Sequence, residues 1–329
     1  MAPLRKAIAA RQVELAKIGY AQFQAALAAR ARSLAYDIFV AQPRANAARE
    51  VADRMQALQE VLVQRDPAGL NSVLETRILE ASALTLQRRA SQAEVAKRAA
   101  LIELNQLRGL PLDATLRVAS IEWQFQPVPA NAELIAAARG YAFELRMRAA
   151  ELAQQGFKVS LARNERHGNI TVAPFYSEEN AGDRERKVGV GVSVPLPLWS
   201  QNAGSVDTAR ARLEQAEVSV RVTQRQIERQ VVTSAGEYAI KVAEIGHWRA
   251  EAAEQFRVAA AEADRHFRLG AVPIATYVEL QKQYLDAIEA LLETRREAFA
   301  AGQQVELLTG VKLHTAGMAR STPLAEPKP

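Results

Sequence analysis

Valine or leucine occupies every second position from Val188 to Leu198, in a chain whose remaining pattern is mostly helical. Successive side chains of a strand point to opposite faces. One face of this run therefore carries Val188, Val190, Val192, Val194, Leu196 and Leu198. The other face begins with Gly189, Gly191 and Ser193 and is nearly bare. Such a strand fits a barrel with a tightly packed interior and an outer face in lipid, whereas a soluble hairpin packed on helices is the alternative.

A second strand candidate, residues 170–180, precedes this run and is about as long as a membrane β-strand needs to be. The charged segment 181–187 between the two is expected to form a solvent-exposed tip. Trp199 follows the run, where an interfacial Trp is expected. Two strands leave two open edges, and an open edge is not tolerated in lipid. We therefore expect these strands to pair with copies from other subunits.

The rest of the chain is typical of long helices, because apolar residues recur at spacings of three and four. The expected helices cover residues 4–64, 72–108, 131–164, 205–265 and 274–308. Pro43 is expected to kink the first helix or end it locally. Residues 110–130 are expected to be irregular or briefly extended, and the tail 314–329 disordered.

A helical hairpin is predicted to occur twice. Gly69 and Gly109 are 40 positions apart, as are Gly270 and Gly310. Helices of about 60 residues would be roughly 90 Å long, so each hairpin must bury its apolar stripe against other hairpins of this chain or of further subunits. The predicted organisation is a partial first repeat (1–130) without a strand pair, a complete second repeat (131–313) with a strand pair at 170–198 and a helical hairpin at 203–310, and the tail.

Composition excludes several classes of protein. The chain has 329 residues and no cysteine, so it has no disulfide, thiolate nucleophile or cysteine metal site. The net charge of +5 is interspersed with acidic residues, which does not favour nucleic-acid binding. No apolar run approaches the 18 residues of a membrane-spanning helix, and the amphipathic start is not a signal peptide. The four histidines are dispersed and are expected to be surface residues. They are His167, His247, His266 and His314. No catalytic motif or cofactor motif is present, so neither an enzyme nor a cofactor is expected.

Three segments together resemble a known family. The passage VGVSVPLPLWSQNAGSVDTARARLEQAE (190–217) is similar to the strand-to-helix passage of TolC-like outer membrane factors, the exit ducts of efflux pumps and type I secretion systems. NERHGNITVAPFY (164–176) resembles that family's helix-to-strand passage, and FRLGAVPIATYVELQKQYLDA (267–287) its second hairpin turn. The PLPLW variant is most similar to the heavy-metal branch, the cobalt-zinc-cadmium and copper-silver efflux ducts.

The resemblance implies a fold and a set of partners. Family members are homotrimers in which two repeats per protomer build a transmembrane β-barrel above an α-helical tunnel. The tunnel meets a periplasmic adaptor, which connects it to an inner-membrane pump, here of the RND type. Outer membrane lipid surrounds the barrel. This chain departs from the pattern because its first repeat lacks the signal sequence, opening helices and strand pair, so a truncated product or a late start is expected.

The resemblance also assigns residues. The two hairpin turns are expected to dock the adaptor and form the periplasmic gate, through Arg65, Asp66, Gly69, Phe267, Arg268, Leu269 and Gly270. Turn chemistry alone explains the glycines equally well. The positions that correspond to the family's aperture carboxylates are Thr276 and Glu279, so a single ring of glutamates is expected, selecting cations over anions.

The sequence thus favours a passive outer membrane duct, with heavy-metal cations as candidate substrates. The alternatives are a soluble coiled-coil scaffold, a periplasmic adaptor, or a truncated duct without function. An adaptor should carry lipoyl-like β segments flanking one helical hairpin, whereas this chain places one strand pair between two hairpins.

Overall fold

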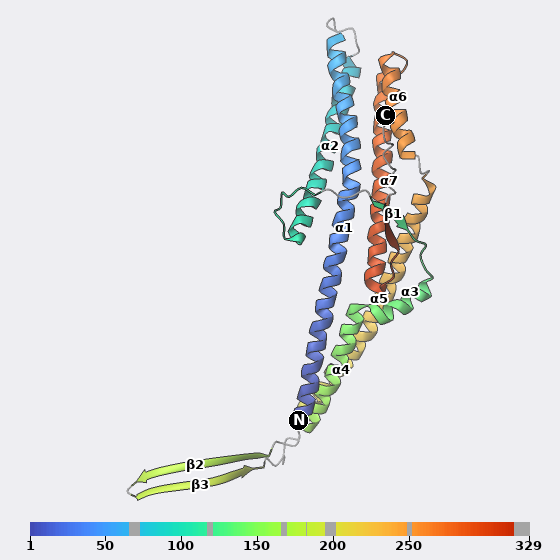
Figure 1. The fold of residues 1–329 in the computed structure, drawn as a ribbon. Coiled ribbons are helices and arrows are strands. Elements are labelled where there is room, and N and C mark those ends of the chain that lie inside the picture. Colours follow the sequence, from blue (N-terminus) through green and yellow to red (C-terminus); the bar gives the residue numbers. More distant parts are fainter. Residues whose placement is uncertain are drawn as a thin grey trace, which may run out of the picture. The chain divides into compact units, whose positions relative to one another are not determined.

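The computed structural model describes residues 1–65, 73–116, 121–165, 170–181, 183–194, 202–248 and 252–318. Helices dominate these ranges, and the mainly α fold expected from the sequence is confirmed (Figure 1). The elements in chain order are α1 (Ala2–Arg65), α2 (Val73–Arg108), β1 (Ile121–Phe125), α3 (Asn131–Tyr141), α4 (Phe143–Asn164), β2 (Thr171–Ala181), β3 (Asp183–Ser193), α5 (Ala203–His247), α6 (Ala252–Arg268), α7 (Ile274–Thr309) and β4 (His314–Met318).

The chain packs as two units, and the long helices α1 and α5 run through both. Unit 1 comprises Met1–Gln24 and Ala138–Arg229, and it contains the β2–β3 hairpin. Unit 2 comprises Ala25–Ala137 and Gln230–Pro329, and it contains α2, α6, α7 and the β1–β4 pair. Each unit therefore combines segments from both predicted repeats. The division of the sequence into repeats stays a prediction about ancestry.

Helix α1 does not end at Pro43. It runs for 64 residues with this proline inside it. Proline removes one backbone hydrogen bond, but α1 is held on both sides of it by buried contacts. Val40 is 6% exposed and Ala48 and Val51 are fully buried, so tertiary packing outweighs the local cost.

Two stretches expected as single helices are each divided. Residues 131–164 form α3 and α4, which are separated at Ala142, where a ψ of 119° leaves the helical region. In place of one helix over 205–265, α5 ends at His247 and α6 begins at Ala252. Residues 249–251 between them lie outside the described residues.

The expectation of a disordered tail from His314 onward is wrong for its first five residues. They form β4, which pairs antiparallel with β1 so that Phe125 lies opposite His314 and Ile121 opposite Met318. His314 is only 7% exposed and the preceding Leu313 only 1%. The segment is ordered because it completes a small sheet over the core of unit 2.

An aromatic cluster joins this small sheet to the helices of unit 2. The rings of Tyr36 on α1 and Phe299 on α7 stack with centroids 4.1 Å apart. Trp123 of β1 packs edge-on against Phe299 at 4.9 Å, and His314 of β4 lies 4.3 Å from the same ring. Such pairs add to the free energy of burial, so this cluster stabilises the contact between the small sheet and the helices.

Tyr238 of α5 anchors the same sheet from the other side. Its ring is fully buried, and its hydroxyl lies 2.8 Å from the carbonyl oxygen of Gln126 and 2.5 Å from that of Leu313. Burial raises the pKa of this hydroxyl to about 12. Gly302 of α7 permits the close approach, because a Cβ there would lie 3.0 Å from the ring of Tyr238 and 3.2 Å from Nδ1 of His314.

Candidate functional site

Strands β2 and β3 form an antiparallel hairpin whose register confirms the alternation seen in the sequence. Val190 lies opposite Pro174, and Gly189 lies opposite Phe175. One face therefore carries Val172, Pro174, Tyr176, Val188, Val190 and Val192. The other carries Thr171, Ala173, Phe175, Gly189, Gly191 and Ser193. Each strand has 11 residues, and the tip is shorter than expected because the strands continue to Ala181 and from Asp183.

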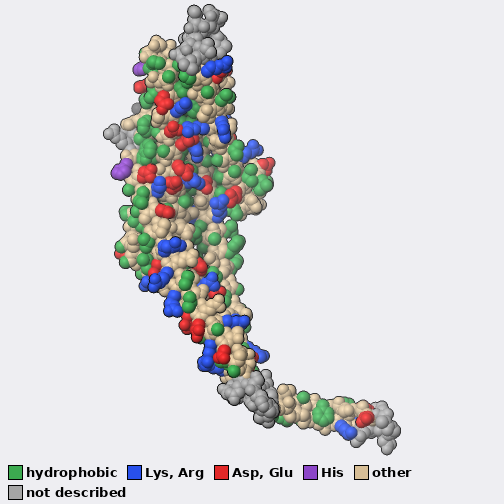
Figure 2. All heavy atoms as spheres, turned by 180° about the vertical axis from the view of Figure 1, so that it is seen from behind, with side chains coloured by type: hydrophobic (Ala, Val, Ile, Leu, Met, Phe, Trp, Pro, Cys, Tyr) green, Lys and Arg blue, Asp and Glu red, His purple; other side chains and the backbone are tan. Residues whose placement is uncertain are grey.

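The apolar face of this hairpin is uncovered in the single chain. Its valines are exposed by 82% at Val188, 65% at Val190, 63% at Val192 and 60% at Val172. Val194, the next position of the alternation, is 55% exposed, whereas Leu196 and Trp199 lie outside the described residues. In the view of Figure 2, hydrophobic side chains lie along the hairpin, and charged ones appear toward its grey end.

Charged and polar groups bound the apolar face at the hairpin tip. Arg186 Nε donates to Glu178 Oε1 over 3.5 Å across the two strands. The hydroxyl of Tyr176 donates to the other oxygen of Glu178 over 3.0 Å. Along this face, the pair Tyr176–Val188 is followed directly by the ion pair Glu178–Arg186. That order is typical of a membrane–water boundary.

The bare face predicted from β3 alone is covered in part by β2. A Cβ at position 189 would lie 2.6 Å from Cζ of Phe175, so the phenyl ring lies directly over Gly189. Analysis of β3 by itself missed this contact. The cross-strand position of Phe175 was the signal that could have found it, because an aromatic opposite a glycine in a strand pair commonly covers it.

A hydrogen bond connects the two helices that flank the hairpin in the sequence. Asn202 precedes α5 with a φ of 55°, a left-handed conformation that asparagine tolerates better than most residues. Its side-chain Nδ2 donates to the carbonyl oxygen of Ala162 in the last turn of α4 over 3.1 Å. The orphan carbonyl at the end of one helix is thereby satisfied from the start of the next.

The turn between α6 and α7 is closed by backbone hydrogen bonds around Gly270. This glycine has a φ of 74°, and its N–H donates to the carbonyl of Phe267 over 2.9 Å. The N–H of Ala271 donates to the carbonyl of His266, also over 2.9 Å. These bonds form the left-handed helix end that glycine favours. Turn chemistry therefore accounts for Gly270, which is one of the two interpretations that the sequence allowed.

The exposed side chains of this turn are fewer than the sequence suggested. Leu269 is 73% exposed, and Arg268 is exposed while its Nε donates to Asp264 Oδ2 over 2.9 Å. Phe267, expected near an exposed tip, is instead half-buried, with its ring centroid 5.1 Å from that of Tyr277. The hydroxyl of Tyr277 donates to Asp264 Oδ1 over 3.1 Å, so Asp264 holds both flanks of the turn.

Thr276 and Glu279 both lie on the exposed surface of α7, shortly after this turn. Glu279 Oε1 accepts a hydrogen bond of 2.7 Å from Gln283, one helical turn on. It makes no ion pair within the described part of the chain. The sequence also placed the other hairpin turn at Arg65, Asp66 and Gly69. Helix α1 ends at Arg65, but the side chain of Arg65 and both other residues lie outside what the structure describes.

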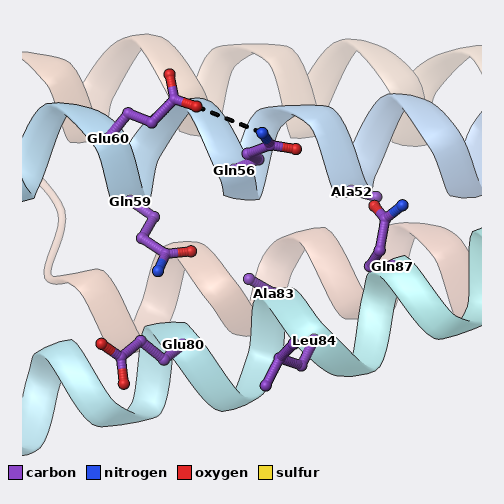
Figure 3. A pocket seen from close by; sticks show the side chains of 8 residues that line it. All are labelled: Ala52, Gln56, Gln59, Glu60, Glu80, Ala83, Leu84 and Gln87. Carbon is purple, nitrogen blue, oxygen red and sulfur yellow. Dashed lines mark hydrogen bonds between the residues drawn. The ribbon is translucent and has the colours of Figure 1, made fainter.

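A hollow of about 660 Å³ lies between α1 and α2 in unit 2 (Figure 3). Its lining is made of alanines, one leucine, amides and two carboxylates: Ala52, Gln56, Gln59, Glu60, Glu80, Ala83, Leu84 and Gln87. Gln56 Nε2 donates to Glu60 Oε1 over 3.4 Å. This lining offers no nucleophile with an adjacent base, so it does not have the chemistry of a hydrolytic site.

The described residues offer neither a membrane-spanning helix nor a metal centre. Among those residues, none of the helices is long and apolar enough to cross a membrane. The same ranges contain no group of three or more His, Cys, Asp or Glu side chains that could hold a metal ion.

The fold is shared with solved channels of bacterial outer membranes. The CmeC outer membrane channel of Campylobacter jejuni matches with a TM-score of 0.75 at 13% identity, over 92% of this chain and 66% of that one. The outer membrane protein VceC of Vibrio cholerae matches with 0.70 at 15% identity, over 93% and 75%. The MtrE outer membrane channel of Neisseria gonorrhoeae, solved in its open state, matches with 0.69 at 14% identity, over 94% and 72%.

Neither a protein-family profile nor a curated protein sequence matches the chain. The chain spans slightly less than two thirds of the CmeC chain. At these identities the comparison establishes the fold: this is the fold of outer membrane channel proteins.

Proposed function

We propose that this chain is a subunit of a TolC-like efflux duct in the outer membrane, a passive exit path and not an enzyme. The observation that carries the proposal is the β2–β3 hairpin, whose apolar face is uncovered in a chain with the fold of outer membrane channels. An uncovered row of valines is unfavourable in water and favourable in lipid. The 11-residue strands are long enough to cross a bilayer at the usual tilt.

Assembly with further subunits follows from the strand edges. Within the described residues, β2 and β3 pair with each other and with no third strand. In a membrane the outer edges must be paired, because lipid offers no hydrogen-bond partners. A homotrimer in which copies of the hairpin and further strands close a barrel satisfies this requirement.

The helices also leave apolar rows for partner helices. On α1, Val13, Tyr20 and Leu27 are exposed and lie seven residues apart, which is the spacing of one side of a coiled-coil seam. On α5, Val222 and Ile240 are exposed by 58% and 66%. Neighbouring protomers of a helical tunnel would cover such rows.

A periplasmic adaptor is the proposed partner of the α6–α7 turn, and an inner-membrane RND-type pump would be reached through it. Leu269 and Arg268 offer one apolar and one cationic group at this turn. Phe267 supports the turn from inside, because it packs against Tyr277. Arg65, Asp66 and Gly69 are proposed to contribute from the other hairpin.

Heavy-metal cations are the proposed substrates, on the strength of the PLPLW resemblance. Glu279 supports cation passage, because it is exposed on α7 and makes no ion pair within the described residues. In a trimer, Glu279→Ala should weaken the preference for cations, measured as the reversal potential across a planar bilayer under a salt gradient. Thr276→Ala, on the same helix surface, is the matched control. An unchanged reversal potential in Glu279→Ala would exclude the glutamate ring.

Membrane insertion tests the proposed function most directly. An arginine on the lipid face of a barrel costs about 2–4 kcal/mol near the bilayer midplane. Val190→Arg should therefore move the protein out of the detergent-extractable outer membrane fraction. Ser177→Arg, near the charged tip of the same hairpin, should leave the distribution unchanged. If Val190→Arg distributes like the unmodified chain, the hairpin does not lie in lipid and the proposed function is wrong.

A further inference from the structure

A basic pocket in unit 1 has no role in the proposed duct. It has a volume of about 320 Å³ and lies between the second half of α4 and the first turns of α5. Two residues of α4 and five of α5 form its lining: Gln155, Lys158, Gly204, Ser205, Thr208, Ala209 and Arg212. Both charged residues of this lining are cations, and they come from different helices.

The two cations have no counter-charge among the described residues. No ion pair joins Lys158 or Arg212 to any carboxylate within the described residues. The acidic residues nearby are already engaged, since Asp207 lies 3.6 Å from Arg210 and Glu165 lies 3.3 Å from Arg5. Two facing cations without an anion between them repel each other, so an anionic ligand would be favoured there.

The pocket also has hydrogen-bonding groups without partners. The hydroxyl of Ser205 makes no hydrogen bond within the described residues, and the N–H groups of residues 203–205 precede the first helical bond, from Val206 N to Asn202 O. These groups can donate to phosphate oxygens.

The position of the pocket along the chain indicates where such a ligand would come from. Lys158 lies six residues before the end of α4, about 9 Å along the helix, and α4 leads into β2. Arg212 lies about 14 Å from the start of α5, which follows β3. If the hairpin lies in lipid, as the proposed function holds, α4 ends and α5 begins near the headgroup layer. Long cationic side chains reach back toward that layer.

We propose that this pocket binds the phosphodiester of an anionic lipid. Lys158 and Arg212 neutralise the phosphate, and Ser205 and the first N–H groups of α5 donate to its oxygens. The bound lipid fixes the depth of the helix ends beneath the hairpin.

The test measures lipid binding to the full chain in detergent by native mass spectrometry. The probes are phosphatidylglycerol, phosphatidylcholine and the soluble headgroup glycerol phosphate. The variant Lys158→Gln/Arg212→Gln removes both cations of the pocket. The control variant Arg221→Gln/Arg225→Gln removes the same number of charges from exposed positions further along α5. Each basic side chain contributes binding free energy toward an anionic lipid. Loss of both should weaken the binding of phosphatidylglycerol to the pocket variant about 30-fold.

The expected result is a preference for phosphatidylglycerol over phosphatidylcholine in the unmodified chain and in the control variant, and its loss in the pocket variant. Equal binding of both lipids, or equal weakening in the two variants, overturns the proposal. Displacement of the lipid by glycerol phosphate at equal concentration also overturns it, since the site would then serve a soluble phosphate. The measurement needs no membrane insertion, so the two proposals can fail separately. If Val190→Arg distributes like the unmodified chain but the chain still prefers phosphatidylglycerol, only the proposed duct function is refuted.

Discussion

Replacing Gly302 by alanine should destabilise the protein, although the same change within a helix usually stabilises it. In a helix interior, alanine is favoured over glycine by about 1 kcal/mol. At position 302, however, the new Cβ would lie 3.0 Å from one ring carbon of Tyr238, 3.1 Å from another and 3.2 Å from Nδ1 of His314. These distances are several tenths of an ångström too short, so one of the neighbours would have to move.

Neither neighbour is free to move without loss. Tyr238 is fully buried, and its hydroxyl is held between the carbonyl oxygens of Gln126 and Leu313. His314 is packed against Phe299 and Trp123. Overpacking of this kind costs about 1–3 kcal/mol, which exceeds the gain in helix propensity. We expect a net loss of about 1 kcal/mol in the free energy of unfolding.

Gly236→Ala is the matched control, because Gly236 is a helical glycine of α5 whose added Cβ would meet nothing within 4 Å. That variant should gain up to about 1 kcal/mol. The assay is urea unfolding in detergent, followed by circular dichroism at the helix band. Opposite signs for the two variants support the packing argument. If Gly302→Ala is stabilised as much as Gly236→Ala, the sheet yields at this contact and the reasoning is refuted.

Two further predictions concern titration and the helical turn. Burial lowers the pKa of His314. The charges of Arg32 and Lys312 lower this pKa further, whereas the charge of Glu306 raises it. The unfolded chain therefore binds a proton near pH 6.5 that the folded chain does not. The free energy of unfolding should fall as the pH drops from 7.5 to 5.5, by at most about 1.4 kcal/mol per pH unit. A His314→Gln variant with the same pH dependence in urea unfolding would contradict this. Tyr277→Phe removes the hydroxyl that donates to Asp264 and should cost about 1 kcal/mol. Hydrogen exchange should accelerate at the α6–α7 turn, and unchanged exchange there would show that Arg268 alone holds Asp264.

The sequence predicted the features that depend on local periodicity. The alternation over 188–192 placed each valine on the correct face, because side chains alternate strictly along a strand. The long helices and the left-handed Gly270 were predicted for the same reason, since spacing and turn chemistry act within a few residues.

Features that depend on distant contacts were not predicted. Strand β4 has the sequence HTAGM, which carries little strand propensity, and it is ordered by pairing with β1. Helix α1 continues through Pro43 because its neighbours on that helix are buried. Two further contacts likewise join separate segments. The ring of Phe175 in β2 covers Gly189 in β3, and Asp264 in α6 accepts hydrogen bonds from Arg268 and from Tyr277 of α7.

The β1–β4 pair also sets an order of events during synthesis. Its partners are about 190 residues apart, and the larger part of unit 1 lies between them. When β1 leaves the ribosome, α7 and β4 have not been made, so Trp123 has neither Phe299 nor His314 to pack against. Long loops close slowly, and a strand that waits is open to wrong pairing. A holding chaperone acting on the nascent chain would therefore have to protect this five-residue strand until α7 and β4 have been made.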